Sequence, residues 1–151
     1  MAKAEKVFIV AKPLDEVWAF LYDMEKVGSC LPGCEKVQVL NELESEWTIK
    51  LKIGPISKTI LARARTTESS APSHAAFVVE APEMQMEGSL DLRSVSPDQT
   101  EVTYRSNAKA RGPLEQLLEQ IIAGRLGADA ETFANNVRLK LEGGGAAPGG
   151  A

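Results

Sequence analysis

The chain has no long hydrophobic run and little of several residue types that carry chemistry. Among its 151 residues no apolar stretch of about 18 residues occurs, so no helix is expected to span a membrane. One histidine and two cysteines are too few for a zinc site built from those residues. The formal net charge of −4 lacks the basic excess of a nucleic-acid-binding face. These absences argue against a membrane-spanning protein, a zinc protein and a nucleic-acid-binding protein.

Common enzyme motifs are absent as well. There is no Gly-rich phosphate loop, no Gly-x-Ser-x-Gly elbow and no His-Glu-x-x-His motif. Cys30 would need a neighbouring base to act as a nucleophile, and the sequence identifies none. His74 lies where a strand is expected to start, and we expect it to be solvent-exposed and idle. We therefore expect no catalytic residue and no metal site.

Cys30 and Cys34 have three residues between them, whereas redox dithiols and zinc knuckles normally have two. We expect a reduced pair of small buried side chains, with a disulfide across the Pro32-Gly33 corner as the alternative. The first residues lead directly into a strand without the apolar region of a signal peptide. The protein is therefore expected in the cytoplasm.

The N-terminal part of the sequence predicts one strand and two short helices. Residues 7–10 are all apolar, which indicates a strand that is covered on both faces. Pro13 suits the first turn of a helix, and Asp23 suits the cap of a second helix over 24–30. One face of the first helix, including a buried tryptophan, is formed by Leu14, Val17, Trp18 and Leu21.

The middle of the chain alternates between apolar and polar residues, which predicts strands. The clearest alternation runs over 46–53. Other strands are expected from residue 35 and over 56–67, 74–80, 84–93 and 100–111. Short turns join them, so about seven strands should form an antiparallel sheet. One face of this sheet must be covered, and the C-terminal helix is the large element that remains.

That helix is expected over 113–142 and carries two apolar stripes. The first consists of Leu114, Leu117, Leu118, Ile121 and Ile122, and the second of Leu126, Phe133, Val137 and Leu141. Gly124 and Gly127 lie where the stripes change over, which predicts a bend, a close packing contact or extra room for a cavity. Residues 1–142 should form one domain, and the Gly/Ala/Pro-rich residues 143–151 a flexible tail or a linker.

A curved sheet that grips a helix tends to leave a cavity, and the expected inward face suits an apolar ligand. Small residues at Gly88, Ser106, Ala108, Ala110 and Gly124 should leave volume. Methionines are adaptable liners, and Tyr104 and Ser106 are the polar candidates for orienting a ligand. Ordinary core packing is the alternative for most single members of the set. The predicted ligand-binding residues are Trp47, Ile49, Leu51, Met84, Met86, Leu90, Tyr104, Ser106, Leu117, Leu118, Ile121 and Ile122.

Several of these features together resemble one family. They are Pro13, Val17, Trp18, Asp23, the Leu31-Pro32-Gly33-Cys34 corner, the Lys52-Ile53-Gly54-Pro55 corner and the helix start Gly112-Pro113. The resemblance is to the CoxG family of carbon monoxide dehydrogenase subunits, within the START-like (SRPBCC, polyketide cyclase-like) superfamily. It covers residues 3–142. It implies an α+β helix-grip fold: a curved seven-stranded antiparallel sheet wrapped around a long C-terminal helix, with two short helices after the first strand.

The resemblance also implies a ligand cavity, an association with aerobic molybdenum-containing carbon monoxide dehydrogenases, and no catalytic motif. We therefore expect a non-catalytic accessory protein that binds and delivers a lipophilic small molecule, without a covalent cofactor. A prenyl quinone such as menaquinone is the hypothesis, since each buried CH₂ of its tail contributes roughly 0.8 kcal/mol. The tail past Glu142 could tether the carrier to a partner or to the inner face of the cell membrane.

Two alternatives stay open. The first is a polyketide cyclase, aromatase or hydratase, with Tyr104 and a cavity carboxylate as acid and base. Glu80 and Glu83 are the nearby strand candidates for that carboxylate. The second is an assembly or maturation scaffold for the dehydrogenase, which acts through its surface. A scaffold predicts an exposed apolar patch in place of a cavity.

Overall fold

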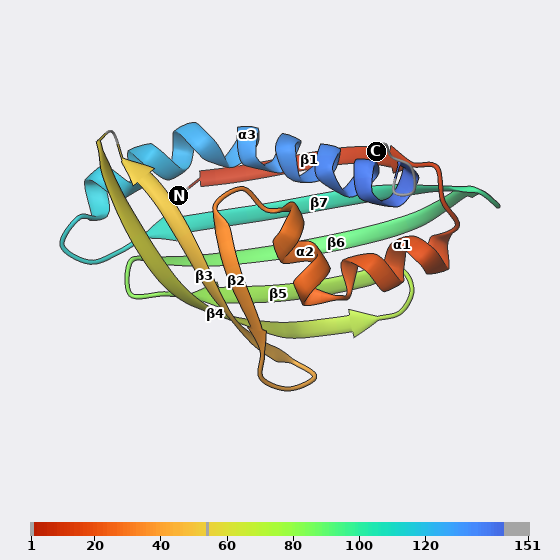
Figure 1. Ribbon diagram of the computed structural model, residues 1–151, viewed down its shortest axis with the longest axis horizontal. Coiled ribbons are helices and arrows are strands. Elements are labelled where there is room, and N and C mark those ends of the chain that lie inside the picture. The colour runs from red at the N-terminus through yellow and green to blue at the C-terminus, as the bar shows by residue number, and fades with distance from the viewer. Residues whose placement is uncertain (1, 54, 144–151) are drawn as a thin grey trace.

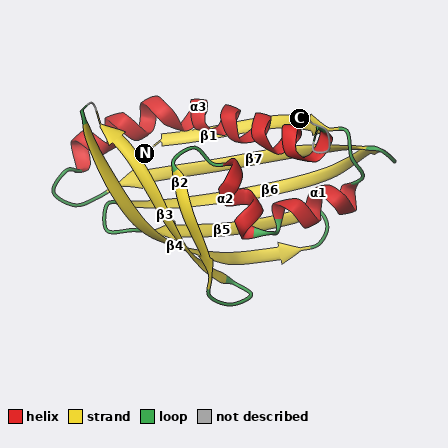
Figure 2. Ribbon diagram, in the orientation of Figure 1, coloured by secondary structure: helices red, strands yellow, loops and turns green. Residues whose placement is uncertain are grey.

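The protein is built from two layers, a sheet and a set of helices that lie against one of its faces (Figures 1 and 2). The computed structural model describes residues 2–53 and 55–143. Figure 2 shows that one long helix runs along the sheet. Two short helices lie over the same face of the sheet. The elements in chain order are β1 (Ala2–Val10), α1 (Leu14–Leu21), α2 (Met24–Cys30), β2 (Cys34–Val39), β3 (Glu44–Ile53), β4 (Ile56–Ser70), β5 (His74–Glu80), β6 (Met84–Ser96), β7 (Gln99–Ala110) and α3 (Glu115–Glu142).

The seven strands follow the order β1-β7-β6-β5-β4-β3-β2, and every neighbouring pair is antiparallel. Apart from the placement of β1 beside β7, each strand pairs with its neighbour in sequence, as short turns dictate. The α+β class, the seven antiparallel strands and the long C-terminal helix that the sequence predicts are therefore confirmed.

The prediction that the first strand is covered on both faces was wrong. β1 is an edge strand and pairs only with β7. Phe8 and Val10 are buried beneath the helices, whereas Val7 and Ile9 remain 50% and 39% exposed on the other face. A run of four apolar residues therefore marks a strand with one buried face here.

Helices α1 and α2 begin and end close to the predicted residues. The side chain of Asp23 accepts hydrogen bonds from the backbone N–H groups of Glu25 and Lys26, so Asp23 caps α2 as expected. Trp18 differs from the prediction, because it is only half-buried. Its ring stacks on that of Tyr22, with 5.1 Å between the centroids. The buried face of α1 consists of Val17 and Leu21, as predicted, together with Phe20.

Helix α3 starts at Glu115, two residues later than predicted, and continues unbroken through both glycines to Glu142. A Cβ added at Gly124 or Gly127 would meet no atom of the described residues within 4 Å, and both positions are exposed. The close packing contact and the extra cavity room expected at these glycines were therefore wrong. A bend of the helix axis there remains a prediction. Residues 144–151 of the predicted tail lie outside the described residues.

The two halves of α3 differ in how they pack. The C-terminal half buries Ala130, Phe133, Ala134 and Val137 in a cluster with side chains of β1, α1, β6 and β7. In the N-terminal half Leu118 is buried, and Ile121, Ile122 and Leu126 are half-buried. Asn136 adds a polar anchor, because its side-chain amide donates to the carbonyl of Cys30 at the end of α2, at 2.9 Å.

Candidate ligand-binding cavity

A cavity of about 490 Å³ lies between the sheet and the helices. Side chains of α1, α2, β2 to β7 and α3 line it, so every element except β1 contributes to its wall. Cavities that hold small-molecule ligands commonly measure about 300–1,000 Å³ and are mostly apolar. The cavity between these elements is of that size, and most of the side chains in its wall are apolar.

The cavity is hollow because alanines occupy several inward positions of the sheet. Ala62 and Ala64 of β4, Ala75 of β5 and Ala108 of β7 are all buried and line the cavity. The neighbouring inward position on β4 is Ile60, which is also buried, so the small side chains form a gap in an otherwise filled face. Outward positions of β4 carry larger residues, such as Leu61 at 68% exposure.

Four of the five small residues expected to leave volume are not part of the cavity wall; they are Gly88, Ser106, Ala110 and Gly124. The space beside Gly88 is filled by the ring of Phe77, into which a Cβ at Gly88 would clash. Gly124 is exposed on the helix. The prediction of a hollow lined by small residues thus depends on other members: Ala108 was expected, whereas the alanines of β4 and β5 were missed.

Nine of the twelve predicted ligand-binding residues line the cavity; they are Trp47, Ile49, Leu51, Met84, Met86, Leu90, Tyr104, Ile121 and Ile122. The other three lie elsewhere. Ser106 and Leu118 are buried but are not part of the cavity wall, and Leu117 is 46% exposed on α3. The nine remain a predicted ligand-binding set.

Tyr104 is a buried polar side chain that lines the cavity from the sheet, as Ser45 of β3 also does. Its ring lies against Phe133, with 5.6 Å between the centroids. Burial raises the pKa of its phenol, the Ser106 hydroxyl partly opposes this effect, and the charge of Asp129 raises the pKa further. The phenol therefore stays neutral at ordinary pH and can donate a hydrogen bond into the cavity.

An ion pair in the cavity wall was missed. Arg125 and Asp129 both line the cavity from α3, with 3.9 Å between a guanidinium nitrogen and a carboxylate oxygen. Burial raises the pKa of Asp129, and the positive charge of Arg125 partly opposes this effect. The sequence contains a signal for both residues. Arg125 follows Ile121 by four residues and Asp129 follows Arg125 by four, so all three lie on the same face of the helix.

The carboxylates proposed from sequence lie outside the cavity. Glu80 is exposed. A carboxylate oxygen of Glu83 lies 3.2 Å from the ammonium nitrogen of Lys58, near the start of β4. Pro82 separates β5 from β6, so neither glutamate lies on an inward position of a strand that lines the cavity. Asp129 of α3 takes the place that the enzyme alternative had assigned to them.

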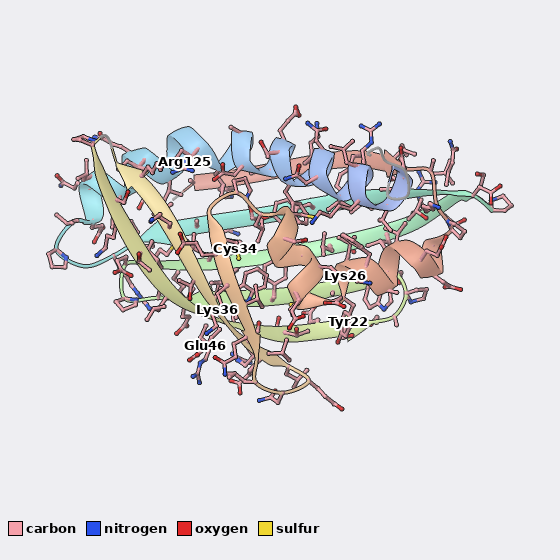
Figure 3. The ribbon with its side chains drawn as sticks, in the orientation of Figure 1. Tyr22, Lys26, Cys34, Lys36, Glu46 and Arg125 are labelled. Carbon is pink, nitrogen blue, oxygen red and sulfur yellow. The ribbon has the colours of Figure 1, made fainter. Side chains whose placement is uncertain are left out.

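The cavity reaches the surface beside the turn between β2 and β3. Tyr22, Val39 and Leu43 all line the cavity and are 38%, 51% and 52% exposed. Other charged residues of the wall also lie on its margin. Asp23 caps α2, and the side chain of Glu44 accepts from Asn41 in the turn. Figure 3 shows Tyr22 where α1 meets α2, beside the hairpin of β2 and β3.

The prediction that His74 is idle was wrong. Its Nδ1 lies 2.7 Å from Asp91 and its Nε2 lies 2.8 Å from Glu68, so the ring joins β4, β5 and β6. Hydrogen bonds to Glu68 and then Asp91 raise the pKa of His74. None of these three residues is part of the cavity wall.

Cys30 and Cys34 are both free thiols. Cys30 is buried, as expected, whereas Cys34 is half-buried and lines the cavity. Burial is the main cause that raises the pKa of both thiols, which keeps them protonated and poorly nucleophilic. Within residues 2–53 and 55–143, no group of three or more histidine, cysteine or carboxylate side chains could hold a metal ion. No helix of that same part is long and apolar enough to cross a membrane.

The fold and the cavity alone do not identify the protein family, but the sequence does. The family model of the carbon monoxide dehydrogenase CoxG subunit matches residues 7–142. The chain belongs to the CoxG family. A comparison with curated protein sequences finds no match.

Solved structures share the fold of this CoxG protein at low sequence identity. A conserved protein from Geobacillus kaustophilus has a TM-score of 0.80 and 19% identity, over 92% of this chain and 94% of that one. A START superfamily protein from Mycobacterium smegmatis has a TM-score of 0.76 and 11% identity, over 94% and 98%. The Zhui aromatase/cyclase from a Streptomyces species has a TM-score of 0.66 and 18% identity, over 96% and 98%. These similarities establish a START-like, cyclase-like fold.

Proposed function

We propose that this CoxG protein binds a lipophilic small molecule in its cavity and delivers it, as a non-catalytic accessory protein of a molybdenum-containing carbon monoxide dehydrogenase. The observation that carries the proposal is the cavity of about 490 Å³, whose sheet wall is made of alanines and large apolar side chains. A scaffold that acts only through its surface has no need of such a hollow. Family membership supports the association with the dehydrogenase.

The ligand that suits this wall is a molecule with a long apolar part and a small polar head. Each CH₂ moved from water into the cavity contributes roughly 0.8 kcal/mol, so an apolar tail can be held without a charged anchor. Met84 and Met86 adapt their shape to different ligands. Tyr104 can donate a hydrogen bond to one oxygen of the head. A prenyl quinone combines these properties and would accept electrons that the dehydrogenase releases.

The first experiment looks for the ligand itself. Native mass spectrometry and organic extraction of the purified protein should recover a lipophilic molecule in about one copy per chain. The purified protein should also bind a short-tailed menaquinone analogue. Failure to recover any lipid, together with failure to bind the analogue, would contradict the proposal.

A matched pair of variants on β4 tests whether the cavity is the site. Ala62→Phe places a ring inside the cavity, whereas Leu61→Phe places one on the outer face of the same strand. We expect at least a tenfold loss of affinity for the analogue in the first variant and no change in the second. Reduction of quinone by the purified dehydrogenase should rise when the wild-type protein is added, and it should not rise with Ala62→Phe.

A second function has one specific observation in its favour. Tyr104, Asp129 and Arg125 bring a phenol, a carboxylate with a raised pKa and a guanidinium to the wall of one cavity. That set would suit an aromatase or cyclase, in which an acid and a base act on a polyketide. Tyr104→Phe separates the two functions, because it should abolish turnover of a polyketide-type substrate but weaken quinone binding only severalfold.

A further inference from the structure

Arg125 lies between the interior cavity and a second hollow on the surface. That outer cleft is lined by Gly33, Cys34, Glu35, Lys50, Lys52 and Arg125. Cys34 and Arg125 line both the cleft and the interior cavity, so the two spaces adjoin at these side chains. Figure 3 shows that Cys34 comes from the start of β2 and Arg125 from α3.

The way in which β2 begins explains why the molecule is open here. β2 pairs with β3 from Val39 back to Cys34, which lies opposite Ile49. The backbone N–H of Lys50 then donates to the carbonyl of Gly33 at 2.8 Å, and none of the described β2 residues pairs with β3 beyond this point. Leu51 and Lys52 therefore belong to the open edge of the sheet, and the cleft lies between this edge and α3.

Gly33 is required for this corner. Its φ of +82° is a conformation that residues with a side chain rarely adopt, and a Cβ there would lie 2.7 Å from the carbonyl oxygen of Lys50. The Leu31-Pro32-Gly33-Cys34 corner thus leads into the start of β2 and contributes Gly33 and Cys34 to the cleft. A sequence feature that could have been a simple turn therefore lies where the cavity and the cleft adjoin.

The cleft has an excess of positive charge and of hydrogen-bond donors. Lys50 lies 3.6 Å from Glu35, and Arg125 lies 3.9 Å from Asp129. Both pairs are long and partly exposed, so they hold their cations weakly and leave donors available. Lys52 adds a further positive charge to the cleft. On the interior side, the neutral phenol of Tyr104 is one more donor.

We propose that this cleft is the portal that holds the polar head of the ligand, with Arg125 as the residue that recognises it. The guanidinium of Arg125 donates to an oxygen of the head, while the tail lies in the apolar cavity. The head must therefore accept hydrogen bonds: a quinone carbonyl or a carboxylate fits, and an ammonium group does not. This inference rests on the proposed function, because it assumes that the cavity binds a lipophile.

Four probes that share one alkyl chain and differ in the head group separate the contributions of head and tail to the affinity. They are an alkyl naphthoquinone, the alkyl naphthalene that lacks the carbonyls, a fatty acid and the matching alkyl amine. Affinities are measured by displacement of a fluorescent lipid from the purified protein. The quinone and the fatty acid should bind at least about tenfold more tightly than the naphthalene and the amine, since a charge-assisted hydrogen bond is lost with the latter two.

The chain offers a matched control for Arg125. Arg138 lies on the same helix and has a carboxylate partner four residues later, Glu142 at 4.0 Å, but it lines neither the cavity nor the cleft. Arg125→Gln should weaken the quinone and the fatty acid about tenfold and change the naphthalene less than twofold. Arg138→Gln should change no affinity. Thermal unfolding followed by circular dichroism should show that both variants fold.

Asp129→Asn distinguishes the two kinds of head. It removes a negative charge beside Arg125, so a carboxylate head should bind severalfold more tightly, whereas a neutral quinone should change less than twofold. Tight binding of all four probes, unaffected by Arg125→Gln, would overturn the portal but leave the carrier function standing. Preference for the alkyl amine would overturn it as well. If no probe binds to the wild-type protein, the proposed function fails and the portal fails with it.

Discussion

The two halves of α3 lie over the same sheet but differ in packing, because one half fills a core and the other lines a cavity. From Ala130 to Val137 the helix packs small and large apolar side chains among Phe8, Val10 and Val102, and this end of the molecule is filled, with Ala130 and Phe133 at the border of the cavity. From Ile121 to Asp129 the helix lines a hollow whose wall also includes the alanines of β4 and β5. One helix thus closes a core at one end and roofs a cavity at the other.

The difference lies in the sheet as much as in the helix. At the filled end the inward residues of β1 and β7 are Phe8, Val10 and Val102. At the hollow end the inward residues of β4 include Ala62 and Ala64. Stability should therefore come mainly from the filled end, and ligand binding from the hollow one. Substitutions and ligand binding can test this division, from the largest expected effect to the smallest.

The largest effect on stability is expected when a buried side chain is removed from the filled end. Phe8→Ala removes a buried ring from a core that cannot collapse, which should cost about 3–5 kcal/mol of the free energy of unfolding. Ile121→Ala removes a half-buried side chain from the wall of an existing hollow, and we expect a loss of only about 1–2 kcal/mol. Urea denaturation measures both. Equal losses would show that the two ends of the molecule are equally packed.

Ligand binding should stabilise the hollow end, which contributes less to the free energy of unfolding than the filled end. A quinone analogue at a hundred times its dissociation constant should stabilise the protein by about 2.7 kcal/mol. Hydrogen exchange should slow at the amides of α3 from Ile121 to Phe133 and change little at those after Phe133, since the filled end is already protected. Uniform slowing along the whole helix would contradict the division.

The sequence predicts which apolar side chains point inward better than it predicts the hollow between them. Alternation and helical spacing place the strands, α3 and the apolar lining residues such as Trp47, Met86 and Ile122, because burial follows these periods directly. A cavity depends on the absence of side chains. Ala62 and Ala64 look like ordinary small residues in the sequence, and only their place in the same cavity wall as Ile121 and Ile122 gives them a role.

The polar part of the site was hidden for a different reason. Arg125 and Asp129 have charged side chains, and a charge on a long helix usually lies on its solvated face. Their spacing from Ile121 carries the information, but it becomes decisive only when the helix is known to roof a cavity. The role of His74 was missed because Glu68 and Asp91 come from two other strands, whose register fixes the contact.

A smaller effect is expected at the cap of α2, the short helix whose residues Met24 and Val27 line the hollow end. Asp23→Ala removes an acceptor for two backbone N–H groups and should cost about 1 kcal/mol of the free energy of unfolding. Because α2 forms part of the cavity wall, the affinity for the quinone analogue should also fall severalfold. Asp23→Asn keeps a good capping residue and should change both quantities little. Loss of stability without any change in affinity would separate α2 from the binding site.

The smallest effect is expected at His74, on the strands that form the wall behind the hollow. Its pKa is raised in the folded protein, above the 6.5 of a free histidine, by Glu68 and Asp91. The protonated ring is the form that both carboxylates favour, so its stabilisation is complete below pH 6.5 and is lost as the pH rises through the raised pKa. The side chain is 31% exposed, and solvent screening keeps the effect small. Urea midpoints of wild type and His74→Gln, compared across this pH range, should converge as the pH increases. A difference that stays constant or grows with pH would show that His74 acts through packing and not through its charge.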